Sequence, residues 1–160
     1  MSFLCLFGSS SNTQTNKIDT TQAIGSTIGG RTVTLQGGQD INIIGSNVIS
    51  DAGTQIQAGQ EINIVAAQNT QTEEHYRHSK SSGLMGTGGA GIFIGTKKES
   101  TESDAQTTTH SGSLVGSLTG DTTIVAGNHY RQLGSDVLAP DGDIVIAGKK
   151  VDIDAAQNTY

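Results

Sequence analysis

The sequence predicts an all-β protein, a parallel β-helix in which short strands wind as successive coils around one thin core. Three observations lead to this prediction. The 160-residue chain repeats itself over a long offset, short apolar alternations recur inside each copy, and only 33% of the residues are hydrophobic while Gly reaches 22. Helix patterns are weak, because β-branched residues and glycines interrupt each stretch of 3.6-residue periodicity.

The long repeat is recognised from short sequence motifs, here called words, that recur in the same order. Ala-Ala-Gln-Asn-Thr at 66–70 returns 89 residues later at 155–159, and one Gly-Ser pair also recurs at 89 and another at 87. Several words on nearly one offset make the chain two copies of one unit. Large side chains would collide where a coil bends, so we expect the Gly-Ser pairs to form corners: Gly25, Ser26, Gly45, Ser46, Gly112, Ser113, Gly134 and Ser135.

Inside each copy a shorter period of 21 residues separates Gly38 from Gly59 and Gly127 from Gly148. Each block carries alternating apolar residues, which is the periodicity of a strand with one buried face. Stacked coils would place these side chains in columns and leave outward positions to polar residues. The predicted core consists of Val33, Leu35, Ile41, Ile43, Ile62, Ile64, Ile124, Ile144, Ile146, Val151 and Ile153.

One block fits the pattern poorly. Aligned on Gly59 and Gly148, Gln55 and Gln57 fall where Ile144 and Ile146 point inward. Either a bulge shifts the register so that Ile56 faces inward, or this coil is locally polar inside.

The repeat divides the chain into four segments: a polar lead-in at 1–22, coils at 23–70, a Gly/Ser/Thr-rich excursion at 71–110, and coils at 111–160. We interpret the excursion as a projecting antiparallel hairpin or a flexible loop with a Gly-rich tip. At an offset of 87, the tract Ser9–Gln22 matches Thr96–Thr109, so we expect the chain to begin partway through such an excursion. The apolar residues of the excursion are candidates for membrane or partner contact: Leu84, Met85, Ile92, Phe93 and Ile94.

Composition excludes several functions. The net charge of −6 argues against nucleic acid as a partner, because phosphate binding needs clustered Lys and Arg. The lone Cys5 allows no intramolecular disulfide and no cysteine metal cluster. The apolar start, residues 1–7, has no basic region or cleavage site, so we expect any export signal to lie outside this chain.

Chemical motifs point away from catalysis. Residues 86–91 match the dinucleotide fingerprint G-x-G-x-x-G, but no helix pattern follows, so we expect no cofactor there. The pair His75 and His78 has no third ligand at a useful spacing, and we expect no metal site. The carboxylates that a β-helix glycosidase would need are not paired with an aromatic groove; the candidates tested are Asp40, Glu61, Asp141, Asp143, Asp152 and Asp154.

The order of these words resembles the haemagglutinin repeats of filamentous haemagglutinin-like exoproteins, above all those of contact-dependent growth-inhibition effectors. The resemblance covers nearly the whole chain and also includes the tract His78–Leu84. It implies a right-handed β-helix, export by two-partner secretion through an outer-membrane transporter, and adhesion, reach or toxin delivery at the bacterial cell surface. No catalytic residue carries over from such repeats.

We therefore expect a non-catalytic structural segment of a large secreted adhesin or effector, whose partners are adjoining repeats, the transporter and a target-cell surface. Open ends of the stack would also favour self-association of the fragment. Two alternatives are a β-helix carbohydrate-active enzyme and a membrane-engaging segment at residues 79–95.

Overall fold

The computed structural model describes residues 8–87 and 91–160, and within these it describes the side chains outside 84–93. All the regular secondary structure in these residues is β-strand. The chain divides into two compact units. The coil unit holds residues 20–70 and 107–160. The excursion unit holds the described part of residues 1–19 and 71–106.

The coil unit consists of three parallel sheets, each of which takes one strand from each of four turns of the chain. The first sheet contains β2 (Thr27–Gly30), β5 (Asn47–Ser50), β10 (Leu114–Ser117) and β13 (Asp136–Leu138). The second contains β3 (Val33–Gly37), β6 (Thr54–Ala58), β11 (Thr122–Ala126) and β14 (Ile144–Ala147). The third contains β4 (Ile41–Ile44), β7 (Glu61–Val65), β12 (His129–Leu133) and β15 (Lys150–Asp154).

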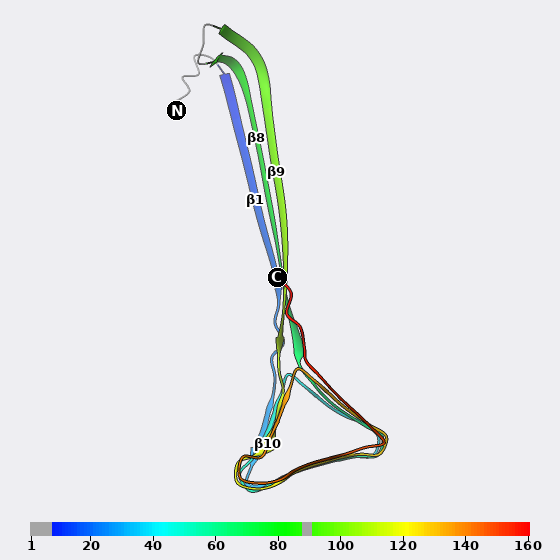
Figure 1. Ribbon diagram of the computed structural model, residues 1–160. Coiled ribbons are helices and arrows are strands. Elements are labelled where there is room, and N and C mark those ends of the chain that lie inside the picture. The colour runs from blue at the N-terminus through cyan, green and yellow to red at the C-terminus, as the bar shows by residue number, and fades with distance from the viewer. Residues whose placement is uncertain (1–7, 88–90) are drawn as a thin grey trace. The chain divides into compact units, whose positions relative to one another are not determined.

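The chain passes through the first, second and third sheets in that order and then begins the next turn. Figure 1 looks along the stack, where paired strands overlie one another and the three sheets form the sides of a triangle. Strands rich in Val, Ile and Thr suit such half-buried pleated surfaces. The unit is therefore all-β and β-helical in its winding.

The strand register places equivalent residues of consecutive turns beside each other. Ile41 pairs with Ile62, which lies 21 positions later in the chain. Thr122 pairs with Ile144, which lies 22 positions later. Asn47 pairs with Leu114 although 67 positions separate them, because the excursion lies between the second and third turns.

Inward side chains of each sheet form columns that run through the turns. In the second sheet Leu35, Ile56, Ile124 and Ile146 follow one another in register, and Ile56 and Ile124 are fully buried. In the third sheet the fully buried Ile62 is followed by the fully buried Tyr130. Eight residues of the expected core are buried or packed against it: Val33, Leu35, Ile41, Ile43, Ile62, Ile64, Ile124 and Ile146.

The expectation of burial is wrong for three residues of the last turn. Ile144, Val151 and Ile153 are 46%, 44% and 58% exposed. They occupy the inward columns, but within the described residues no further turn is stacked on β14 and β15. Their exposure follows from their place at the end of the stack.

The uncertain register of the second turn is settled by the strand pairing. Ile56 faces inward and is fully buried, while Gln55 and Gln57 are exposed. Ile144 pairs through Thr122 with Thr54 rather than with Gln55. Counted between residues that pair in register, Ile144 lies eight positions after Asp136, whereas Thr54 lies seven after Asn47. Lys150 lies six positions after Ile144, whereas Glu61 lies seven after Thr54. The two changes cancel.

The excursion unit consists of the greater part of one three-stranded sheet. This sheet is built from β1 (Gly8–Thr21), β8 (Ala67–Thr87) and β9 (Gly91–Ser111), with β8 in the middle (Figure 1). Since only residues 88–90 separate β8 from β9, the two strands run in opposite directions, because parallel neighbours need a much longer crossover. β8 and β9 thus have the arrangement expected for a hairpin. The expected glycine-rich tip includes residues 88–90, which lie outside the described residues.

Candidate functional site

A ladder of serines joins the four turns at one corner of the coil unit. The backbone N–H of Ser26 donates to the Oγ of Ser46, that of Ser46 donates to Ser113, and that of Ser113 donates to Ser135, each over 3.1 Å. Each accepting hydroxyl also donates to the carbonyl oxygen that closes its own turn, at Ile44, Val65 and Leu133. The expected Gly-Ser corners therefore lie one above another, and each accepting serine hydroxyl bonds both within and between turns.

Two of the glycines that precede these serines are required by the tight bend. Gly45 and Gly134 have φ values of +53° and +54°, a region that residues with a Cβ rarely adopt. A Cβ added to Gly45 would overlap the side chain of Ala67, and one on Gly134 would overlap Ala156. The small residues of the Ala-Ala-Gln-Asn-Thr word thus make room for the corner of the turn beside it.

The asparagine of the same word fixes the place where the chain leaves the coil unit. The Oδ1 of Asn69 accepts the backbone N–H of Ala23 at 2.8 Å, and the Oδ1 of Asn158 accepts that of His110 at 3.0 Å. Asn158 lies 89 residues after Asn69, and His110 lies 87 after Ala23. The two repeat copies therefore make the same contact, which spacing alone did not reveal.

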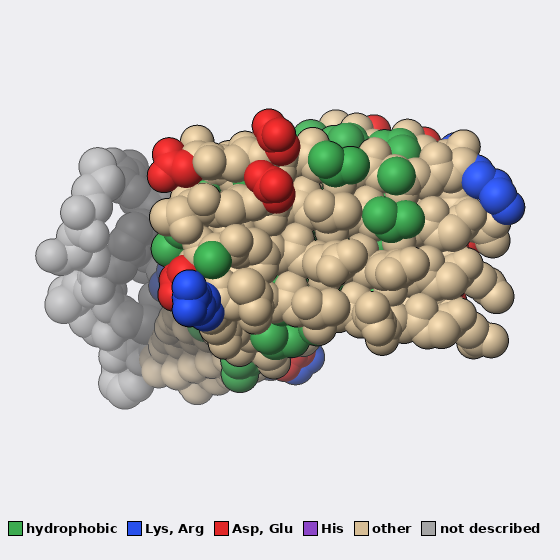
Figure 2. All heavy atoms as spheres, turned by 90° about the horizontal axis from the view of Figure 1, so that it is seen from below, with side chains coloured by type: hydrophobic (Ala, Val, Ile, Leu, Met, Phe, Trp, Pro, Cys, Tyr) green, Lys and Arg blue, Asp and Glu red, His purple; other side chains and the backbone are tan. Residues whose placement is uncertain are grey.

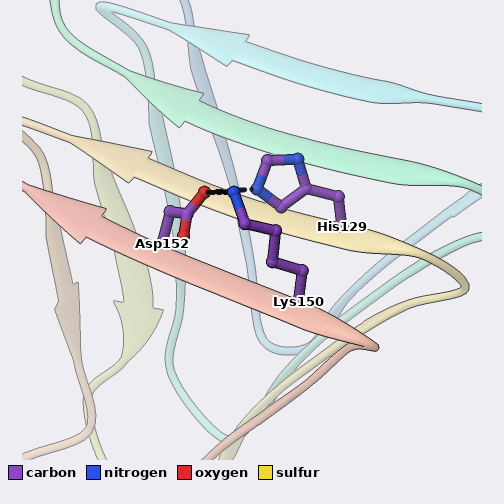
Figure 3. Close-up of polar contacts among 3 residues, drawn as sticks. All are labelled: His129, Lys150 and Asp152. Carbon is purple, nitrogen blue, oxygen red and sulfur yellow. Dashed lines mark hydrogen bonds and ion pairs between the residues drawn. The ribbon is translucent and has the colours of Figure 1, made fainter.

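A charged cluster lies on the outward face of the third sheet, where β12 pairs with β15. The Nε2 of His129 is 2.8 Å from Asp152 Oδ2, and the Lys150 ammonium bonds to the same oxygen (Figure 3). The hydrogen bond from Lys150, followed by that from His129, lowers the pKa of the Asp152 carboxyl. The cluster ties the third turn to the fourth, so Asp152 has a structural explanation.

Two other carboxylates of the coil unit, those of Asp40 and Asp121, accept backbone N–H groups of the next turn. Asp40 Oδ1 accepts the backbone N–H of Glu61 at 3.1 Å, so these two lie in neighbouring turns as expected. The backbone N–H of Asp143 donates to the side chain of Asp121 at 2.9 Å. These bonds join one turn to the next, as the serines do.

The histidines do not gather at one place. His75 Nδ1 lies 2.5 Å from Asn16 Oδ1, which joins β8 to β1 in the excursion unit. The ring of His78 stacks on Tyr76 with centroids 6.4 Å apart. Within residues 8–87 and 91–160, no three His, Cys, Asp or Glu side chains are grouped as metal ligands would be.

The apolar pattern of the sequence does not indicate two buried residues with polar groups, Tyr130 and Gln132. Tyr130 and Gln132 replace the isoleucines of the inward columns in the third turn. The hydroxyl of Tyr130 donates to Gln132 Oε1 at 2.8 Å, and Gln132 Nε2 donates to the Ser135 carbonyl at 2.6 Å. Burial raises the pKa of Tyr130 to about 12. The alternation of apolar residues could not find this pair, because one member is polar.

One exposed face carries little charge. Figure 2 shows one face on which uncharged side chains and backbone dominate and acidic and basic side chains are few and scattered. On the first sheet, a shallow groove of about 60 Å³ lies between the outward side chains of Ile49, Leu114 and Leu138. Of the apolar contact candidates, Ile94 is 77% exposed on β9, and the side chains of Leu84, Met85, Ile92 and Phe93 lie outside those described.

These columns and corners define a class of protein, a β-helical repeat segment that stacks turn upon turn. The chain belongs to the hemagglutinin repeat family, whose model matches residues 7–160. No solved structure shows significant similarity to it. In the described part of the chain we find no helix with the length and hydropathy of a membrane span.

The relatives are much longer proteins. The chain is 37% identical over 139 residues to Toxin CdiA of Yersinia pestis, covering 87% of this chain and 4% of that protein. It is 40% identical over 121 residues to Deoxyribonuclease CdiA of Yersinia pseudotuberculosis serotype O:3, covering 76% and 11%. It is 36% identical over 132 residues to tRNA nuclease CdiA of Escherichia coli O6:K15:H31, covering 81% and 4%. The chain thus corresponds to a small repeat portion of each relative.

Proposed function

We propose that this chain is a non-catalytic structural and interaction segment of a large exported protein of the contact-dependent growth-inhibition type. Its role there is to add length and rigidity that give reach, adhesion or toxin delivery at the bacterial surface. In this proposal its partners are adjoining repeats, an outer-membrane transporter and the surface of a target cell. In this proposal the segment consists of a polar lead-in at 1–22, coils at 23–70, an excursion at 71–110 and coils at 111–160.

The serine ladder is the observation that carries the proposal. It runs through both repeat copies and uses the same atoms at each step. Because the same hydrogen bond from a serine N–H to a serine Oγ joins each turn to the next, many such turns can stack in succession. We further propose that the winding is that of a right-handed parallel β-helix with coils of about 21 residues, which the right-handed rule for parallel crossovers supports.

The length proposal is tested in a full-length relative. Inserting five additional copies of the 89-residue unit adds two turns per copy, and at roughly 4.8 Å per turn this lengthens the filament by about 50 Å. Electron microscopy of the surface filaments measures the change. Filaments of unchanged length would contradict the proposal, because the unit would then not stack in line.

The enzyme alternative is tested on the purified chain. Incubation with DNA, RNA and polysaccharides is expected to show no turnover above background. A variant with Asp141, Asp143, Asp152 and Asp154 changed to Ala is the control. Turnover that this variant loses would replace the structural proposal by an enzymatic one.

A membrane-engaging role of residues 79–95 is a second candidate, favoured by the exposure of Ile94 on the outer strand of the excursion sheet. Flotation with liposomes is measured for the chain, for a deletion of 79–95 and for Ile94→Ser. Reduced flotation of both variants supports this role, and equal flotation of all three ends it.

A further inference from the structure

β9 is one of the two edge strands of the excursion sheet, and near its end this chain begins to pair with its outer side. Within the described residues β9 has β8 as its single neighbour in the sheet. Near its end, however, the N–H of Thr108 donates to the carbonyl of Thr159 at 2.8 Å, and the N–H of Thr159 donates back at 2.9 Å. This antiparallel bridge lies on the side of β9 that faces away from β8.

The two residues of this bridge correspond, by the sequence repeat, to one residue in each of two neighbouring strands of the excursion sheet. Thr159 lies 89 positions after Thr70, which belongs to β8, and Thr108 lies 87 positions after Thr21, which ends β1. β1 and β8 are hydrogen-bonded neighbours. The matching asparagine contacts of Asn69 and Asn158 hold the chain in the same way at both places. The bridge at Thr108 therefore repeats the start of the β1–β8 pairing.

We propose that the outer edge of β9 is a binding site for a strand with the sequence of β8, donated by a second copy of this repeat. β1 shows the arrangement, since it is the counterpart of β9 by sequence and already accepts β8 in this chain. Successive excursions then form one continuous antiparallel sheet. This inference concerns how repeats recognise each other and does not depend on export or toxin delivery.

The donor and acceptor groups of the site follow from strand geometry. Thr108 directs both its N–H and its carbonyl to the outer edge, so the residues at steps of two, Gln106, Asp104 and Glu102, do the same. On the incoming strand, Thr159 directs its groups toward β9, so its counterpart Thr70 and then Thr72 and Glu74 would do so. The two sets interleave as an antiparallel ladder.

The test uses the intact chain and a synthetic peptide of residues 67–83. Hydrogen exchange followed by NMR is expected to show that the peptide protects the backbone amides of Gln106, Asp104 and Glu102. Methylating the peptide nitrogens at Thr72 and Glu74 removes two donors that face β9, and we expect binding to weaken at least about tenfold. Methylation at Gln71 and Glu73 is the matched control, because those nitrogens face the opposite edge, and its binding is expected to stay within about threefold.

A substitution in the protein gives an independent measurement. Gln106→Pro removes an outer-edge donor without removing a bond to β8, and it is expected to weaken peptide binding. Thr20→Pro is the control on β1, where by the same repeat the amide faces away from β8. The proposal is overturned if the amides of β9 gain no protection, if the two methylated peptides bind alike, or if Gln106→Pro and Thr20→Pro have equal effects.

Discussion

The hydroxyl of Ser113 donates to the carbonyl of Val65 over 2.9 Å, although 48 residues separate the two in sequence. In the turns without an excursion the same bond spans two residues, from Ser46 to Ile44 and from Ser135 to Leu133. The chain therefore leaves the corner after Val65 and returns to the same corner at Ser113, and the hydrogen-bonded bend is closed as if nothing had been inserted.

Replacing Ser113 by Ala should destabilise the coil unit. The side chain is 2% exposed, and its loss leaves both the Ser46 amide and the Val65 carbonyl without this partner. We expect the free energy of unfolding to fall by about 1–3 kcal/mol, measured by urea denaturation. Ser26→Ala is the control, since Ser26 joins the ladder through its backbone amide, and an equal loss there would argue against the role of the hydroxyl.

Removing the hydroxyl of Tyr130 should cost stability through Gln132. In Tyr130→Phe the Gln132 Oε1 loses its donor, and we expect a loss of about 1–2 kcal/mol in the free energy of unfolding. Gln132→Met should also destabilise, and the double variant should lose less than the sum of the two single variants. A double-mutant cycle that shows simple additivity would mean that the two side chains do not interact.

Alkaline pH should unfold the coil unit through the same tyrosine. Burial raises the pKa of Tyr130 to about 12 from the ordinary 10, so the folded chain holds the phenol proton more tightly. Its contribution, roughly 2–3 kcal/mol, is complete below pH 10 and is lost as pH rises from 10 through 12. Unfolding free energies measured from pH 9 to 12 should fall less steeply in Tyr130→Phe. Tyr76→Phe, at a residue that is 41% exposed, should retain the steep fall.

The carboxyl of Asp152 should titrate below the ordinary range. Its pKa is lowered first by the bond to Lys150 and second by that to His129. Lys150→Met should therefore raise the midpoint more than His129→Gln, as followed by the carboxyl carbon signal in NMR. The stability from this carboxylate is present above its unfolded pKa and is lost as pH falls through the lower folded value. If 1 M salt leaves the midpoint unchanged, charge attraction is not the cause.

The uncovered aliphatic side chains of the last turn should drive association between molecules. Replacing Val151 and Ile153 by Lys places charges on groups that are already 44% and 58% exposed, so the folded chain should tolerate them. We expect light scattering to show smaller species for this variant than for the unaltered chain. As a matched change, Lys at Asn42 and Asn63, on the outward face of the third sheet, should not reduce association.

Much of the fold was predictable because repetition is visible in the residues themselves. The Gly-Ser corners recur as words, and stacking turns must place identical bends above one another. The core positions were predictable where apolar and polar residues alternate along a strand, as at Ile62, Asn63 and Ile64. These features depend on local pattern and on one offset.

Other features depend on three-dimensional neighbours and were missed. Tyr130 and Gln132 satisfy each other inside the core, so neither matches an apolar pattern. The alignment of Ile56 with the inward column depends on two spacings between paired residues that differ by one position and compensate. The role of Asn69 requires Ala23, which is 46 residues away, and no spacing rule connects them.

The closing of one corner by Ser113 and Val65 has a consequence for how such chains change over time. Because the same atoms rejoin the stacked turns whatever lies between them in sequence, the excursion can lengthen, shorten or be exchanged without altering the columns of the coil unit. The corner is thus a graft point, at which new sequence can be added to a rigid rod while the rod keeps its form.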